Sequence, residues 1–223
     1  MSDFRYSPAE HLGTVSRELR DGERDGTPLR VLVVERRFAA APEEVWSAIT
    51  TPERIPRWLA PVSGDLRPGG RFQVEGNAGG EVLACEEPTR LEVTWEYGGD
   101  TSWVEVTLLE HDEGTLLRLE HAAPVPPQLW EEFGPGAVGI GWEMMLMGIA
   151  EHVADPAFSA AEVQSFLASP EGQAYVGEYM TASSRAWGVT QAAYGTDPAQ
   201  AEAAAARCLA AYTGADAAED TEG

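Results

Sequence analysis

Five short runs of alternating apolar and polar residues constrain the fold of this chain more than any other feature. The runs span residues 71–76, 81–86, 90–97, 102–110 and 115–121. Gly, Pro and Asp fill the connections between them, and connections this short favour antiparallel neighbours over parallel crossovers. Alternation places the apolar side chains on one face of each strand. The runs therefore predict an antiparallel sheet whose apolar face needs a cover.

The cover is expected in the segment Gly136 to Ala154, where apolar residues recur at helical spacing. The stripe consists of Val138, Trp142, Met145, Leu146, Ile149 and Val153. Burying one Trp side chain removes roughly 150–250 Å² from water, which is worth several kcal/mol at about 25 cal/mol per Å². This gain is enough to dock a long helix onto the sheet.

The flanking segments carry weaker signals. A strand over residues 29–38 is expected to pair in a hairpin with a strand over 14–19, and two short helices begin at Pro42 and near Pro52. Three more helices are predicted up to about residues 167, 194 and 214. The expected organisation is an N-terminal segment with a hairpin strand over 1–28, a sheet-and-helix domain over 29–154, a helical extension over 155–214 and an acidic disordered tail over 215–223.

Charge and cysteine content exclude several classes of function. The chain has 37 acidic and 15 basic side chains and a formal charge of −22. Such a surface repels phosphate backbones and anionic headgroups, which disfavours binding to nucleic acid or to a membrane surface. Cys85 and Cys208 lack the spacing of a disulfide framework or a metal site, and no metal or phosphate-binding motif is present. We therefore expect a cytoplasmic protein without a cofactor, because a signal peptide and a long apolar span are also missing.

Residues 29–153 also carry a set of short motifs in a fixed order. These are Ala41-Pro42-Glu43-Glu44-Val45-Trp46, Thr51-Pro52-Glu53 with Arg57-Trp58, Arg67-Pro68-Gly69-Gly70, Leu91-Glu92-Val93-Thr94-Trp95, Leu119-Glu120-His121 and Gly141-Trp142. In this order and spacing they resemble the START/Bet v 1-like (SRPBCC) superfamily, and within it the bacterial homologues of the C-terminal domain of the activator of the heat-shock-protein-90 ATPase. The resemblance implies an α+β helix-grip fold, in which a curved antiparallel sheet wraps a long helix.

In this superfamily the space between sheet and helix often holds a lipid, sterol, polyketide or other hydrophobic molecule, so the resemblance implies a ligand site there. The candidate ligand-binding residues are Arg36, Phe72, Trp95, Val106, Leu119, His121, Trp142, Met145, Leu146 and Ile149. Ligand sites are mostly apolar with a few orienting polar groups. His121 is expected to orient a ligand or to be satisfied by a backbone group at its strand end. Arg36 is expected to enter the pocket, to pair with Glu143 or to reach solvent.

Several alternatives stay open at this stage. The same inward-facing side chains could fill the interior themselves, and His11, His111 and His152 are expected on loops or helix surfaces. Members of the superfamily include cyclases and hydrolases as well as carriers, so an enzyme acting on a bound ligand is one alternative function. A co-chaperone that uses its outer surface is another. Met180, Trp187 and Tyr194 recur at seven-residue spacing, which predicts an aromatic edge covered by the chain's own body or by a homodimer partner.

Overall fold

The computed structural model describes residues 6–112, 114–157 and 160–214. All of its strands come before the long helices of the C-terminal half. The strands are β1 (Val15–Arg24), β2 (Thr27–Phe38), β3 (Val62–Gly64), β4 (Arg71–Val74), β5 (Gly79–Glu86), β6 (Arg90–Tyr97), β7 (Asp100–His111) and β8 (Gly114–Ala123). The helices are α1 (Pro8–Gly13), α2 (Pro42–Thr50), the 3-10 helix η1 (Ile55–Arg57), α3 (Pro127–Phe133), α4 (Gly136–Ala154), α5 (Ala160–Ala168), α6 (Pro170–Tyr194) and α7 (Pro198–Thr213). The predicted tail over 215–223 lies outside the described residues.

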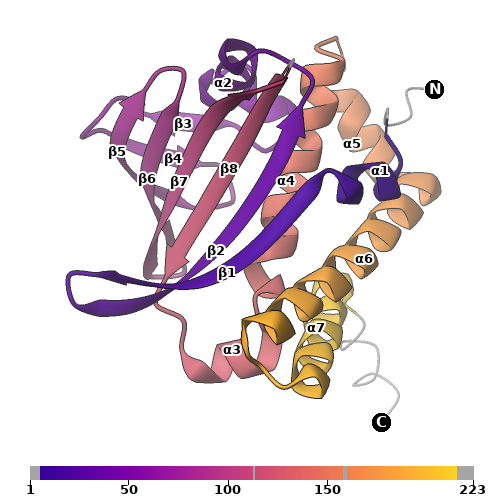
Figure 1. Ribbon diagram of the computed structural model, residues 1–223. Coiled ribbons are helices and arrows are strands. Elements are labelled where there is room, and N and C mark those ends of the chain that lie inside the picture. Colours follow the sequence, from indigo (N-terminus) through magenta and orange to yellow (C-terminus); the bar gives the residue numbers. More distant parts are fainter. Residues whose placement is uncertain (1–5, 113, 158–159, 215–223) are drawn as a thin grey trace.

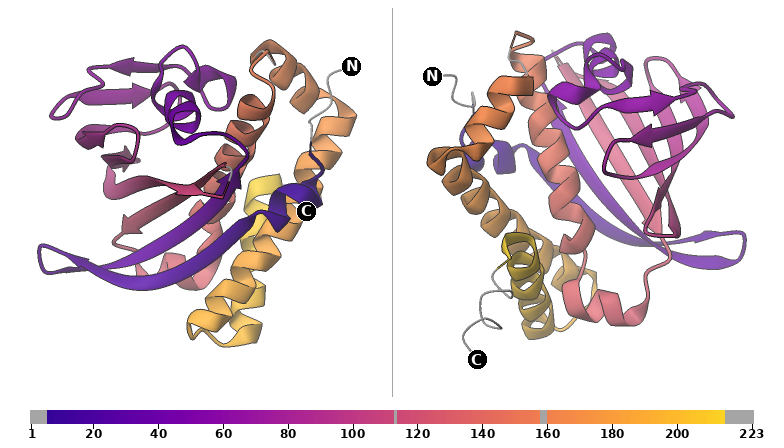
Figure 2. Two further views of the ribbon diagram at one scale, coloured as in Figure 1. Left: turned by 45° about the horizontal axis from the view of Figure 1, so that its top comes forward. Right: turned by 180° about the vertical axis from the view of Figure 1, so that it is seen from behind.

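The strands form one antiparallel sheet in the order β1-β2-β8-β7-β6-β5-β4-β3. Helix α4 crosses the concave face of this sheet, and α2 and η1 lie at one end of it (Figures 1 and 2). The α+β helix-grip fold is therefore confirmed, and α4 has the bounds that its apolar stripe predicts. One member of the stripe is misplaced, because Val138 is exposed while its neighbour Ile140 is fully buried.

The first hairpin is longer than the sequence pattern indicates. Strand β1 continues through Asp21 and Gly22, which pair with Arg30 and Leu29 and do not form a turn. The turn lies at Asp25-Gly26, where both residues have positive φ angles of 50° and 77°. Two consecutive positive φ angles are typical of the two-residue turns that match the twist of a hairpin. The resulting ribbon supplies one edge of the sheet.

Alternation along the strands gives the two faces that the sequence predicts. Val93, Val106 and Leu119 belong to the buried core, whereas the opposite face carries ion pairs. On that face Arg90 contacts Glu105 at 2.7 Å, and Arg118 contacts Glu35 at 2.5 Å. The apolar face lies under α4, so the core and any cavity are confined to this side of the sheet.

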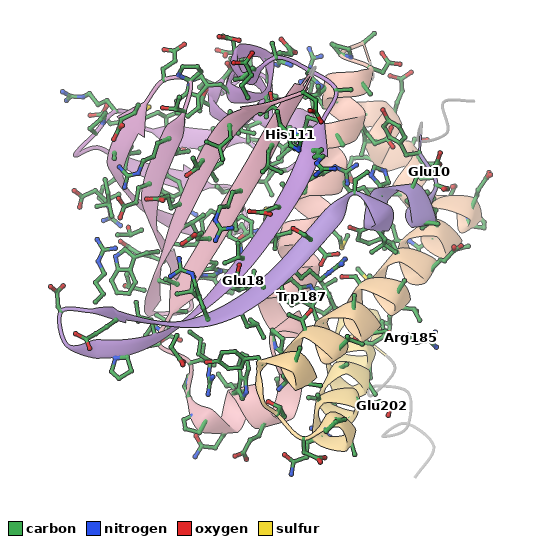
Figure 3. All side chains as sticks on the ribbon, viewed as in Figure 1. Glu10, Glu18, His111, Arg185, Trp187 and Glu202 are labelled. Carbon is green, nitrogen blue, oxygen red and sulfur yellow. The ribbon has the colours of Figure 1, made fainter. Side chains whose placement is uncertain are left out.

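Helices α6 and α7 cover the side of α4 that faces away from the sheet (Figure 2). Ser169 caps α6 by accepting a hydrogen bond from the amide of Gly172, and the helix ends at Gly195, as its sequence predicts. Trp187 is fully buried and projects from α6 toward β1 and α4, while Arg185 faces solvent (Figure 3). The predicted aromatic edge of α6 is thus packed within the chain, and a homodimer through it stays a prediction.

A buried ion pair joins the two helical layers to the sheet. Glu143 of α4 is fully buried and accepts two hydrogen bonds, of 2.6 and 2.7 Å, from Arg17 of β1. Ser183 of α6 donates to the same carboxylate at 3.0 Å. Sequence reasoning considered Arg36 as the partner of Glu143, and the structure assigns that role to Arg17. A buried carboxylate left without its partner costs several kcal/mol, so Arg17 and Glu143 are required together.

The close approach of α4 and α6 depends on Gly139. A Cβ atom at this position would lie 2.2 Å from the Trp187 ring, so Gly139→Ala should lower the free energy of unfolding by about 1–3 kcal/mol. Gly177 of α6 is the matched control, because a Cβ there meets no atom within 4 Å. Gly177→Ala should stabilise the protein by up to about 1 kcal/mol through helix propensity. Denaturant unfolding of both variants measures the difference, and equal effects would contradict this account of the packing.

Candidate functional site

A cavity of about 170 Å³ lies between the concave face of the sheet, α4 and the segment from α2 to β3. Eight of the ten candidate residues line it. These are Phe72, Trp95, Val106, Leu119, Trp142, Met145, Leu146 and Ile149. At its rim Leu66 is 36% exposed, and Val62 and Leu59 are partly exposed. The interior between sheet and helix is therefore not completely filled by side chains.

Three aromatic rings form one side of the cavity. The Phe72 and Trp95 rings lie 6.3 Å apart between centroids, and Trp95 and Trp142 lie 5.0 Å apart. Both contacts are tilted, with interplanar angles of 42° and 55°. Such distances fall in the range where aromatic pairs attract beyond their buried area. The rings thus give the cavity a rigid apolar wall built from three separate elements.

A hydrogen-bond relay behind this wall connects the indole of Trp142 with the backbone of Trp95. Trp142 Nε1 donates to Nδ1 of His121 at 2.9 Å. Because an indole N–H can only donate, Nδ1 accepts and the His121 proton sits on Nε2. Nε2 therefore donates to Ser102 Oγ at 2.7 Å, and that hydroxyl donates to the carbonyl oxygen of Trp95 at 3.0 Å. The relay joins Trp142 to Trp95 through groups that lie outside the cavity.

His121 itself does not line the cavity. Its side chain is buried behind Trp142, with the two rings edge to face at 5.6 Å between centroids. Burial lowers the pKa of His121 to about 4, so the imidazole is neutral near pH 7. Both ring nitrogens are occupied by protein partners. His121 is thus a positioning residue for Trp142 and Ser102. The sequence included it among the candidate ligand-binding residues, and the structure places it behind the cavity wall.

Arg36 also lies away from the cavity. It is on the inner face of β2, as its phase with Val34 predicts, but no residue of β2 contributes to the cavity lining. Its Nη2 donates instead to Nδ1 of His11 at 2.8 Å. Helix α4 packs against β2, and α1 meets Arg36 through His11. The sequence pattern predicted the face of the sheet correctly and could not show which side of α4 the residue occupies.

His11 and His152 are buried, which contradicts their expected place on loops or helix surfaces. His11 accepts from Arg36, so its Nε2–H donates to Glu151 of α4 at 2.9 Å. His152 accepts at Nε2 from Arg54 Nε at 3.0 Å. The signal that could have revealed His11 is the capping box of α1, where Ser7 and Glu10 cap each other and place a short helix at this position.

Polar groups around the cavity are few. Thr50 Oγ1 donates to the carbonyl of Trp46 at 2.8 Å, and Trp58 Nε1 donates to the carbonyl of Ala48 at 2.9 Å. Of the described residues that line the cavity, none is Asp, Glu, His or Arg. Partial burial and the nearby Glu87 raise the pKa of the Cys85 thiol, so it is a poor nucleophile near neutral pH. The arrangement suits enclosure of an apolar molecule better than acid–base chemistry.

Other types of site receive no support from the described part of the chain. No group of three or more His, Cys, Asp or Glu side chains in residues 6–112, 114–157 and 160–214 is placed to hold a metal ion. Within the same ranges, no helix has the length and apolarity needed to cross a membrane.

The sheet, the long helix and the apolar cavity together define a helix-grip protein of the START/Bet v 1-like kind. A family model described as activator of Hsp90 ATPase homolog 1-like protein matches residues 39–154, and the chain belongs to this family. The match covers just over half of the chain and ends with α4.

Solved structures extend the similarity beyond that range. The crystal structure of CalU16 from Micromonospora echinospora is 36% identical, covers 80% of this chain and 98% of CalU16, and superposes with a TM-score of 0.61. The solution structure of CalU16 gives 35% identity and a TM-score of 0.64 over 82% of this chain and 98% of CalU16. MLL2253 from Mesorhizobium loti is 28% identical with a TM-score of 0.50, covering 57% of this chain and 98% of MLL2253. No functionally curated protein matches the chain.

The relay predicts an unusual titration of His121. Burial lowers its pKa from 6.5 to about 4, so its imidazole resonances should keep their neutral positions from pH 8 to about 5. Nitrogen shifts should show a proton on Nε2 and none on Nδ1. Because the folded state disfavours the charged form, its contribution to stability is complete above pH 6.5 and is lost as the pH falls toward 4, a loss of about 3 kcal/mol. A titration midpoint near 6.5 or a proton on Nδ1 would contradict the relay.

Proposed function

We propose that the protein binds a small hydrophobic molecule, such as a lipid or a polyketide, in the cavity between the sheet and α4. The observation that carries this proposal is an apolar cavity of about 170 Å³ in the interior of the fold. An engineered apolar cavity of about 150 Å³ stays dry and binds benzene, and one water occupies about 30 Å³ in the liquid. The cavity is therefore large enough for a small apolar group and offers water few partners.

Binding is favoured over catalysis by the chemistry of the wall. A cyclase or hydrolase needs a general acid, a general base or an activated nucleophile within reach of the substrate. The cavity lining contributes the Cys85 thiol, whose pKa is raised, and the Thr50 hydroxyl, which donates to the carbonyl of Trp46. The imidazole of His121, which lies behind Trp142, is engaged on both nitrogens. Enclosure of a ligand requires none of these groups. We therefore rank carriage or sensing of a ligand above its turnover.

Contact with a chaperone is the alternative that the family description raises. Such contact would use the outer surface of the sheet or of the helices and would not depend on the cavity. A variant with a filled cavity should then keep its chaperone binding and lose its ligand. The two functions are separable by one substitution.

That substitution is Val106→Phe, which adds a ring inside the cavity. Naphthalene is a suitable probe, because it is apolar and has no hydrogen-bonding group. At 100 times its Kd, a ligand raises the free energy of unfolding by about 2.7 kcal/mol, so naphthalene should raise the Tm of the unsubstituted protein. It should also change the fluorescence of the wall tryptophans. Val106→Phe should weaken naphthalene binding by about tenfold or more.

The matched control is Thr107→Phe, which places the same ring on the opposite face of β7. This variant should bind naphthalene as the unsubstituted protein does. Native mass spectrometry of the freshly purified protein supplies a second readout, since a retained natural ligand would appear as added mass. The proposal fails if naphthalene and a panel of fatty acids and aromatic polyketides give no thermal shift and no added mass is found. Equal loss of binding in both variants would also contradict it.

A further inference from the structure

A second cavity, of about 280 Å³, lies on the other side of the η1 segment from the first. It is bordered by α4, by residues 56–59 and by α5, which lies beside the C-terminal half of α4 (Figure 1). Trp58, Leu59 and Met145 line both cavities and form the wall between them. Unlike the first cavity, the second has charged residues in its lining.

His152, which is one of the lining residues, carries a buried hydrogen-bond donor that has no partner. Its side chain is only 2% exposed, and its Nε2 is occupied by Arg54. Because a guanidinium can only donate, Nε2 must accept, and the His152 proton therefore sits on Nδ1. Nδ1 is buried and has no hydrogen-bond partner in the structure. Burial and the positive charges of Arg54 and Arg57 lower the pKa of His152 to about 4, which agrees with a neutral ring.

Arg57 adds an uncompensated positive charge to the same lining. Its guanidinium donates to the carbonyl of Pro156 and forms no ion pair with a described carboxylate. Glu151, which also lines the cavity, is engaged elsewhere, since it accepts from the amide of Tyr6 and from His11. Arg54 is compensated by Glu44 at 2.6 Å. The charge balance therefore leaves room for one anion beside Arg57.

The rest of the lining is apolar and adaptable. Met144 and Met147 of α4 face Val163 and Leu167 of α5 across the cavity. Methionine side chains are flexible and polarisable, and they adjust to irregular apolar groups. The volume far exceeds the roughly 30 Å³ of a single water, so one water on His152 Nδ1 would leave most of the space empty.

We propose that the second cavity binds a small amphipathic carboxylic acid. Its carboxylate accepts the hydrogen bond from His152 Nδ1–H and pairs with Arg57, and its alkyl part packs against Met144, Met147 and Leu167. Charge-assisted hydrogen bonds to a carboxylate are stronger than neutral ones, so the charge of the ligand contributes much of its affinity. This site is separate from the cavity over the sheet, and its occupation does not require a ligand there.

Octanoate is the probe, with octan-1-ol as the neutral analogue of equal chain length. Calorimetric titration of the full chain at pH 7 should show one octanoate per protein. Octan-1-ol should bind about tenfold more weakly or worse, because it lacks the charge that pairs with Arg57. Arg57→Met, which keeps an apolar stem, should weaken octanoate binding by about the same factor.

Two filling variants assign the site. Leu167→Trp fills the second cavity from α5 and should weaken octanoate binding by about tenfold or more. Val106→Phe fills the first cavity and should leave octanoate binding unchanged. Naphthalene, measured on the same proteins, reports on the first cavity, so failure of one site is distinguishable from failure of the other.

Nuclear magnetic resonance gives a readout that does not depend on the folding of a variant. Octanoate should shift the His152 Nδ1–H resonance of the unsubstituted protein. Four outcomes would overturn the proposal: no octanoate binding, equal binding of octan-1-ol, loss of binding in Val106→Phe but not in Leu167→Trp, or binding that leaves the His152 resonance unmoved.

Discussion

Helix α4 is buried on two opposite sides, and the rest of the structure follows from this constraint. One side packs on the concave sheet through Trp142, Leu146 and Ile149, and the other meets α6. A helix enclosed in this way must satisfy any charge that it carries inside the protein. Glu143 and Glu151 meet this requirement through Arg17 and through His11, which in turn contacts Arg36. The partners come from the N-terminal helix and hairpin, so those elements are tied to the C-terminal half of the chain.

Three buried histidines have the same hydrogen-bonding arrangement. His11, His121 and His152 each accept a hydrogen bond from a group that can only donate, namely Arg36, Trp142 and Arg54. An obligate donor fixes the tautomer of its acceptor and opposes protonation. The pKa of each of these histidines is lowered accordingly, mainly by burial. These neutral histidines link helices and strands through hydrogen bonds and are poorly suited to acid–base catalysis.

The sequence predicted the sheet, the long helix and most of the cavity wall because these depend on periodicity. Val106 and Leu119 alternate with charged residues, and Trp142, Leu146 and Ile149 share one helical face, so their burial follows from local spacing alone. Arg36 and His121 lie on the inner face of the sheet, as the alternation predicts, but neither lines the cavity. Alternation along a strand shows which face a side chain is on, and it does not show where the side chain lies relative to α4. His11 and His152 were misjudged for a related reason. The burial of His11 depends on the formation of α1. The burial of His152 depends on contacts with residues more than 90 positions away, such as Arg54. No local sequence pattern reports such contacts.

The short strand β3 has a consequence for the cavity rim. It has only three residues, pairs with β4 alone and forms an edge of the sheet that includes the rim residue Val62. Local opening is least costly where few backbone bonds and few buried contacts must be broken. The Trp142 ring, in contrast, is held in place by its hydrogen bond to His121. The β3 edge is therefore the part of the cavity rim that is expected to open at the lowest cost in free energy.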